Sequence, residues 1–211
     1  VESWKDTEIY PPEGVIKKTI YRGQEEKSQV SLNFTGQHPW SRLDNYAMKS
    51  MESVMRIKLR ETLREDMSGT YGTRIGSSLS LYPREEYSIT ISFGCEPDRV
   101  DELIGAVFQV IDSVQVYGVD MSYIEKVKES QRRSYESQFE RNRFWLSNLV
   151  SYAMREDDPA MILAYPELID SLNPDMVQEA ANSFFNMDNY VQFVLRPENE
   201  KQLPGLGIRQ K

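Results

Sequence analysis

Five stretches of this chain have the alternation or the β-branched and aromatic composition of strands. The clearest examples are Ser28 to Thr35, with Val30, Leu32 and Phe34 on one face, and Glu86 to Cys95, with Tyr87, Ile89, Ile91 and Phe93 on one face. The first two stretches are separated only by the polar turn from Gly23 to Lys27, so they are predicted to form an antiparallel pair. The predicted strands are Val15–Arg22, Ser28–Thr35, Tyr71–Tyr82, Glu86–Cys95 and Tyr190–Leu195.

In the rest of the chain, apolar residues recur every three or four positions, which predicts amphipathic helices. The first runs from Arg42 to about Asp66, with Gly69 as its terminator. A long third stretch, up to about Arg155, has apolar residues again at its end, and a break is expected near Phe139 to Arg143 because helices of that length are unusual. Asp120 or Ser122 caps this long stretch, and the other helical segments begin at Pro97-Asp98, at Pro159 and at Asn173-Pro174.

Pairs of strands therefore alternate with helices in the order β-β-α-β-β-α-α-α-α-β. This order predicts an α+β fold, with an antiparallel β-sheet and helices packed on one face as a two-layer sandwich. Residues 1–14 contain Pro11, Pro12 and Gly14 and are interpreted as a linker. Residues 15–197 form a single domain, and 198–211 are interpreted as a flexible tail.

The overall charge argues against nucleic acid as a partner. The chain has 211 residues and a net charge of −8, whereas phosphate binding needs a concentrated basic face. Arg132 and Arg133 are interleaved with glutamates, as on a solvated helix with ion pairs. The chain contains no run of eighteen apolar residues, so no membrane span is predicted. The cellular compartment stays open, with the bacterial periplasm or cell envelope as one expectation.

Several kinds of catalytic site are disfavoured by the residues present. The only histidine is His38 and the only cysteine is Cys95, whereas a zinc site needs three or four ligands. The cysteine ends a predicted strand and is expected to be a buried, unreactive thiol. Ser68-Gly69 has no second histidine to support a nucleophile. The adjacent carboxylates of Asp157-Asp158 diverge rather than converge on a bond.

The best candidate for chemistry is the segment from Arg64 to Gly72, which spans a predicted helix end and turn. It places the guanidinium of Arg64 and the phenol of Tyr71 seven positions apart, where both can point to one spot. Such donors suit a carbonyl or the oxyanion that develops from it. The alternative is an exposed arginine beside a half-buried strand tyrosine. Spacing alone does not choose between these.

The segment from Leu63 to Tyr71, Leu-Arg-Glu-Asp-Met-Ser-Gly-Thr-Tyr, resembles the Leu-Arg-Glu…Gly…Tyr signature of the insulinase/pitrilysin family of zinc metallopeptidases. The resemblance is to the later, metal-free half of those proteins and extends from about Pro12 to Pro197. Supporting matches include Pro12-Glu13-Gly14-Val15, Asn142-Arg143-Phe144-Trp145-Leu146 and Arg196-Pro197.

The resemblance implies an α+β half with an antiparallel sheet that pairs with a similar half to enclose a chamber. The first half of family members carries an H-x-x-E-H zinc motif, which this chain lacks, so zinc is expected in a companion catalytic half. Family members bind the substrate backbone through an arginine and a tyrosine of the second half, and the matching positions are Arg64 and Tyr71. The linker-like start and the absence of an initiating methionine before Val1 favour a companion upstream, although a separate subunit stays open.

Two functions follow as hypotheses. In the first, the chain is the non-catalytic, substrate-binding half of a zinc metallopeptidase: it has no catalytic or metal-binding residue of its own, is inactive alone and acts on peptide substrates with its companion. In the second, it is a catalytically inactive family member that serves as a structural or protein-interaction subunit.

Overall fold

The computed structural model describes residues 9–70 and 72–199 of the chain. Most of the predicted linker and of the predicted tail, residues 1–8 and 200–211, lies outside the described residues, as does Tyr71. Residues 9–13 of the linker have no regular structure, and Gly14 forms a bend before the first strand.

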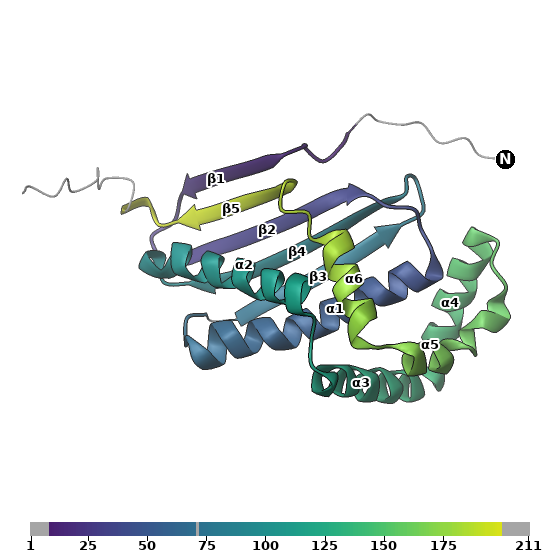
Figure 1. Cartoon of the computed structure of the whole chain (residues 1–211). Helices are drawn as coiled ribbons and strands as arrows, with labels where there is room; N and C mark the ends of the chain where they lie inside the picture. Colours follow the sequence, from purple (N-terminus) through teal and green to yellow (C-terminus); the bar gives the residue numbers. More distant parts are fainter. Residues whose placement is uncertain (1–8, 71, 200–211) are drawn as a thin grey trace, which may run out of the picture.

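The described strands form a mixed sheet in the order β1-β5-β2-β4-β3. The central strand β2 (Ser28–Gln37) is antiparallel to both of its neighbours. At one edge β3 (Gly72–Ser80) is antiparallel to β4 (Glu86–Cys95). At the other edge β1 (Val15–Tyr21) is parallel to β5 (Tyr190–Arg196) (Figure 1).

The predicted pairing of the first two strands is wrong, because β5 lies between them. The physical reason lies in their side chains. Tyr190 and Val194 of β5 are buried and pair with Phe34 and Val30 of β2, so β5 continues the apolar face of the sheet. Every residue of β1 is exposed, so this strand contributes no core residue and takes the edge.

Helices cover one face of the sheet, as predicted (Figure 1). The helices that pack on it are α1 (Arg42–Arg60), α2 (Val100–Tyr117) and α6 (Pro174–Phe184). A π-helical turn η1 (Glu61–Asp66) extends α1, and a 3-10 turn η2 (Pro97–Arg99) leads into α2. None of the described helices is long and apolar enough to cross a membrane.

The core lies between this helical layer and the sheet. Phe34 is fully buried and contacts the ring of Phe185 edge-on, with ring centroids 5.1 Å apart. Alternate residues of β2 and β4 face this core, and helix positions three and four apart face it from above. Its largest fully buried side chains include Phe34, Phe93, Phe184, Phe185, Leu32, Met48, Met51, Met55, Leu59, Leu63, Ile89 and Ile91.

A second helical region, the α3–α5 lobe, packs beside α1 and away from the sheet (Figure 1). It consists of α3 (Met121–Phe139), α4 (Asn142–Arg155), the 3-10 turn η3 (Pro159–Ile162) and α5 (Tyr165–Ser171). The break between α3 and α4 lies where the sequence predicts it, and the connector from Pro159 is helical, as expected.

The apolar residues that predict α4 do not form its buried face. Leu146, Leu149, Val150 and Met154 are exposed by 66%, 46%, 49% and 65%, and Tyr152 is the residue of α4 recorded as buried. Their spacing correctly indicates a helix, but no described element lies over this side of it. Among the aromatic residues around this helix, Tyr152 is buried, whereas Phe139, Phe144 and Trp145 are half-buried.

Candidate functional site

Arg64 lies on the π-helical turn that ends the first helix. The amide of Met67 donates to the carbonyl of Thr62 at 3.1 Å, and the amide of Gly69 donates to the carbonyl of Leu63 at 2.9 Å. These bonds span five and six residues, so the last turn is wider than an α-helical one. Single π-turns inside helices are frequent at functional sites, because the extra residue changes the direction of neighbouring side chains.

The base of this turn is fixed by η2 and by the first turn of α2. The Nη1 of Arg99 donates to the carbonyl of Met67 at 3.0 Å. A Cβ placed on Gly69 would lie 2.6 Å from Cδ2 of Leu103, so a larger residue here would have to displace the end of the Leu103 side chain. Leu63, next to Arg64, is fully buried. The backbone that carries Arg64 is therefore anchored on three sides.

The side chain of Arg64 itself is exposed, and it makes no hydrogen bond or ion pair with any described residue. Glu61, one turn earlier, accepts a 2.6 Å hydrogen bond from the hydroxyl of Tyr123 and so is occupied. Tyr71 lies outside the described residues, so the joint direction of the guanidinium and the phenol stays a prediction.

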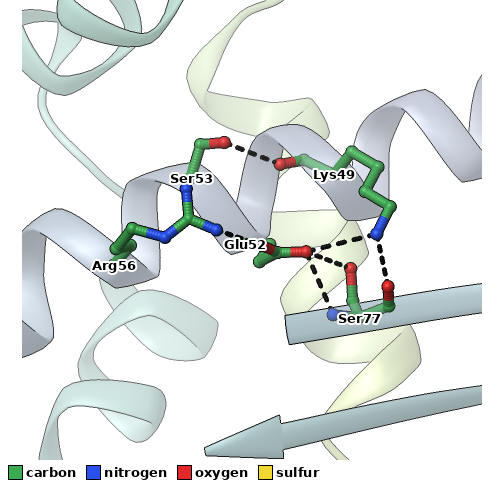
Figure 2. Close-up of polar contacts among 5 residues, drawn as sticks. All are labelled: Lys49, Glu52, Ser53, Arg56 and Ser77. Carbon is green, nitrogen blue, oxygen red and sulfur yellow. Dashed lines mark hydrogen bonds and ion pairs between the residues drawn. The ribbon is translucent and has the colours of Figure 1, made fainter. Parts of the chain in front are cut away.

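A buried glutamate fixes the middle of α1 to the edge strand β3, as Figure 2 shows. Glu52 accepts hydrogen bonds from the amide of Ser77 at 3.0 Å and from its hydroxyl at 2.6 Å. It also forms ion pairs with Lys49 and Arg56, and Lys49 donates to the carbonyl of Ser77. The outward backbone groups of Ser77 are thereby paired, which closes this point of the sheet edge.

Sequence reasoning missed this Glu52 cluster. Its signal was present, because Lys49 and Arg56 stand three and four positions from Glu52, the spacing at which helical charges pair. What the sequence lacked was any indication that Ser77 of a distant strand would complete the set.

The other residues considered in the sequence make local contacts in the structure. His38 lies 3.6 Å from a carboxylate oxygen of Asp44, and its ring centroid is 4.7 Å from that of Phe184. Cys95 is buried, as expected, and burial raises the pKa of its thiol to about 11. Arg133 pairs with Glu129 on the surface of α3, in agreement with the predicted solvated helix. The adjacent carboxylates of Asp157 and Asp158 make local contacts, Asp157 with Arg155 and Asp158 with the amide of Ala160.

Within the described ranges, no three His, Cys, Asp or Glu side chains are grouped closely enough to hold a metal ion. The described residues therefore do not offer a zinc site. What the end of α1 offers instead is one permanent positive charge with free hydrogen-bond donors on a rigid backbone.

The described residues thus form a two-layer α+β domain with an exposed arginine on the turn that ends its first helix. The profile of the family described as "Peptidase M16 inactive domain" matches residues 3–131. The chain belongs to this family.

The curated relatives are longer proteins. The chain is 27% identical over 146 residues to "Probable zinc protease PqqL" of Haemophilus influenzae, which covers 69% of this chain and 16% of that protein. It is 23% identical over 171 residues to "Probable zinc protease PqqL" of Escherichia coli, covering 80% of this chain and 18% of that protein. The chain thus spans about a sixth of the length of these relatives.

Comparison with solved structures finds the same fold in a related protein. The crystal structure of the periplasmic protease PqqL from Escherichia coli superposes with a TM-score of 0.76 at 21% identity, covering 87% of this chain and 21% of that chain. At this identity the likeness establishes the fold.

Proposed function

We propose that this chain is the non-catalytic, substrate-binding half of a zinc peptidase. Its membership of the M16 inactive-domain family and the zinc proteases among its relatives support this assignment. The zinc ion belongs to a companion catalytic half, which lies either in the same polypeptide or in a separate subunit. Peptide is the substrate class.

The observation that carries the proposal is the exposed, unpaired guanidinium of Arg64 on an anchored π-turn. A guanidinium held by rigid backbone can donate to the carbonyl of a bound peptide, and it interacts more strongly with the oxyanion that forms when that carbonyl is attacked. Tyr71 would add a neutral donor beside it. Both residues position substrate and stabilise charge, and neither transfers a proton.

The test is made with the full-length protein. Replacing Arg64→Ala is expected to lower kcat/KM for peptide cleavage by about 100-fold, the scale of a lost oxyanion donor. Arg64→Lys keeps the charge but loses the planar fork of donors, so it is expected to recover only part of the activity. Tyr71→Phe removes only the hydroxyl and is expected to have a smaller effect.

Arg133→Ala is the matched control. Arg133 is also on a helix surface, with 78% of its side chain exposed, but it lies on α3 and pairs with Glu129. It is expected to leave cleavage unchanged. Equal turnover of the Arg64→Ala variant and the wild type would remove Arg64 from the mechanism, provided that chelator abolishes the activity of both.

A second candidate function, that of an interaction subunit, is favoured by the outer face of α4. Leu146 and Met154 are about two-thirds exposed there, and contiguous exposed apolar surface marks protein–protein contact sites. The two functions separate in one measurement. If the full-length protein cleaves no peptide, and the Leu146→Gln variant no longer associates with its partner protein, the chain is an interaction subunit.

A further inference from the structure

A cleft of about 550 Å³ opens between the first half of α1 and the α3–α5 lobe. It lies on the side of α1 that faces α3, α4 and α5, and Arg64 is not among its described lining residues. Aromatic side chains supply part of its wall, and side-chain amides supply another part, which is the combination that binds peptide backbone and apolar side chains together. The aromatic residues of the wall are Trp40, Tyr46, Phe144, Tyr135, Tyr152 and Tyr165.

The floor of the cleft is a fixed set of hydrogen bonds. The hydroxyl of Tyr46 donates to Oε1 of Gln131 at 2.8 Å, and Nε2 of Gln131 donates to the hydroxyl of Ser50 at 3.0 Å. Burial raises the pKa of Tyr46 to about 12, so the phenol keeps its proton at neutral pH. These bonds join α1 to α3 and so hold the two helices on either side of the cleft in place.

The charged side chains among the described residues that line the cleft are Arg42, Lys49 and Arg155. Lys49 is paired with Glu52 and Arg155 with Asp157, two carboxylates that are not among these lining residues. The guanidinium of Arg155 lies over the rings of Trp40 and Tyr152, at 4.7 and 5.0 Å from their centroids, with only its Nε bonded to Asp157. Arg42 donates from Nη2 to the carbonyl of Met161, so its charge has no carboxylate partner among the described residues.

This positive lining contrasts with the chain as a whole, whose net charge is −8. Net charge does not locate a field. Long-range attraction would favour cationic peptides, whereas inside the cleft the guanidinium of Arg42, which has no carboxylate partner among the described residues, and the Nη groups of Arg155 favour a carboxylate.

A line of cations connects the cleft to Arg64. Arg42, Lys49, Arg56, Arg60 and Arg64 are seven, seven, four and four positions apart, which places them on one side of a helix. Figure 2 shows Lys49 and Arg56 projecting on either side of Glu52. From Arg42 to Arg64 the helix rises by roughly 30 Å, the span of about nine extended residues.

We propose that the cleft between α1, α3 and α4 is a second peptide-binding site, which takes a peptide segment bearing a carboxylate, with Arg42 and Arg155 as the residues that contact it. The carboxylate is either an acidic side chain or the terminal carboxylate of a peptide. This inference extends the proposed substrate-binding function to a second place on the chain, and its test requires no companion half and no cleavage.

The test is isothermal titration calorimetry of the 211-residue chain with four peptides at low salt. They are acetyl-Gly-Phe-Glu-Phe-Gly-amide, acetyl-Gly-Phe-Gln-Phe-Gly with a free terminal carboxylate, the same Gln peptide as the amide, and acetyl-Gly-Phe-Lys-Phe-Gly-amide. At least one carboxylate peptide is expected to bind about tenfold more tightly than the Gln amide, the factor of one charge-assisted hydrogen bond. Which carboxylate peptide binds more tightly identifies the source of the carboxylate.

Arg42→Gln and Arg155→Gln are each expected to reduce the ratio of the affinities for the carboxylate peptide and for the Gln amide toward one. Arg133→Gln is the control that keeps this ratio. Because Arg155 also packs on Trp40, thermal unfolding of each variant is recorded, and Arg42→Gln tests the site independently. Ser134→Phe narrows the cleft without changing its charge and is expected to abolish binding. No heat from any peptide, tightest binding of the Lys peptide, or wild-type preference in both arginine variants would overturn the proposal. Because cleavage is not measured, these outcomes are independent of the result for Arg64.

Discussion

The sheet-facing core and the α3–α5 lobe both show apolar residues at helical spacing, yet they use them in opposite ways. In α1 the apolar positions are fully buried against the sheet, as at Met51 and Met55. In α4 they face outward, as at Leu146 and Leu149, while the side toward the body of the protein carries Asn148, Ser151 and Arg155 and lines a cleft. The core therefore accounts for stability, whereas the lobe provides surface that can bind other molecules.

The largest expected effect comes from truncating a side chain in the core. Phe34→Ala is expected to lower the free energy of unfolding by about 3–5 kcal/mol, because Phe34 is fully buried and touches three other aromatic rings. Urea denaturation followed by circular dichroism measures the loss. Phe193→Ala on the same sheet is the control, since Phe193 is 41% exposed. A loss below about 1 kcal/mol for Phe34→Ala would contradict the assigned core.

The next test concerns the joint between α1 and β3. Glu52→Ala is expected to cost about 2 kcal/mol, because it leaves the amide of Ser77 without its acceptor and separates Lys49 and Arg56 from their counter-charge. Chemical denaturation at neutral pH gives the value. Glu129→Ala removes an exposed ion pair with Arg133 and is expected to cost less than about 0.5 kcal/mol. Equal effects of the two variants would show that the Glu52 cluster contributes no more than a surface pair.

The pH dependence of folding stability tests the buried core through Cys95. Burial raises the pKa of its thiol from the ordinary value of 9.0 to about 11, so the folded state holds a proton that the unfolded chain releases between these values. The stability associated with this proton is complete below pH 9 and is lost as the pH rises toward 11. From pH 7 to pH 10 the loss is about 1 kcal/mol.

The measurement is the urea midpoint of the wild type and of Cys95→Ala at pH 7 and pH 10. The alanine variant starts from lower stability but is expected to lose less of it between the two pH values. Parallel losses in both proteins would mean that the thiol does not titrate in this range.

The smallest effect is expected on the outer face of α4. Leu149→Ala is expected to change the free energy of unfolding by less than about 0.5 kcal/mol, because its side chain is already 46% exposed and alanine favours helix. Thermal denaturation of the isolated chain is the measurement. A loss of several kcal/mol would mean that this face is covered when the chain is folded, and the comparison between the two regions would then fail.

The sequence alone determined most of the elements and the family. Alternation in Glu86 to Cys95 and three-four spacing after Arg42 predict a strand and a helix that the structure contains, because these patterns follow from backbone geometry that is local. The break after Phe139 was predictable because an uninterrupted helix of that length is unusual. The signature around Arg64 indicated the metal-free half of the insulinase/pitrilysin zinc metallopeptidases, and the match to the Peptidase M16 inactive domain confirms this resemblance.

Only the tertiary structure decided how these elements meet. The position of β5 between β1 and β2 depends on Tyr190 and Val194 completing the face made by Phe34 and Val30, which are more than 150 residues away along the chain. The outward face of α4 and the cleft behind it depend on which neighbours are present, and residue spacing does not carry that information. Periodicity states which residues share a side, and long-range packing decides whether that side meets protein or water.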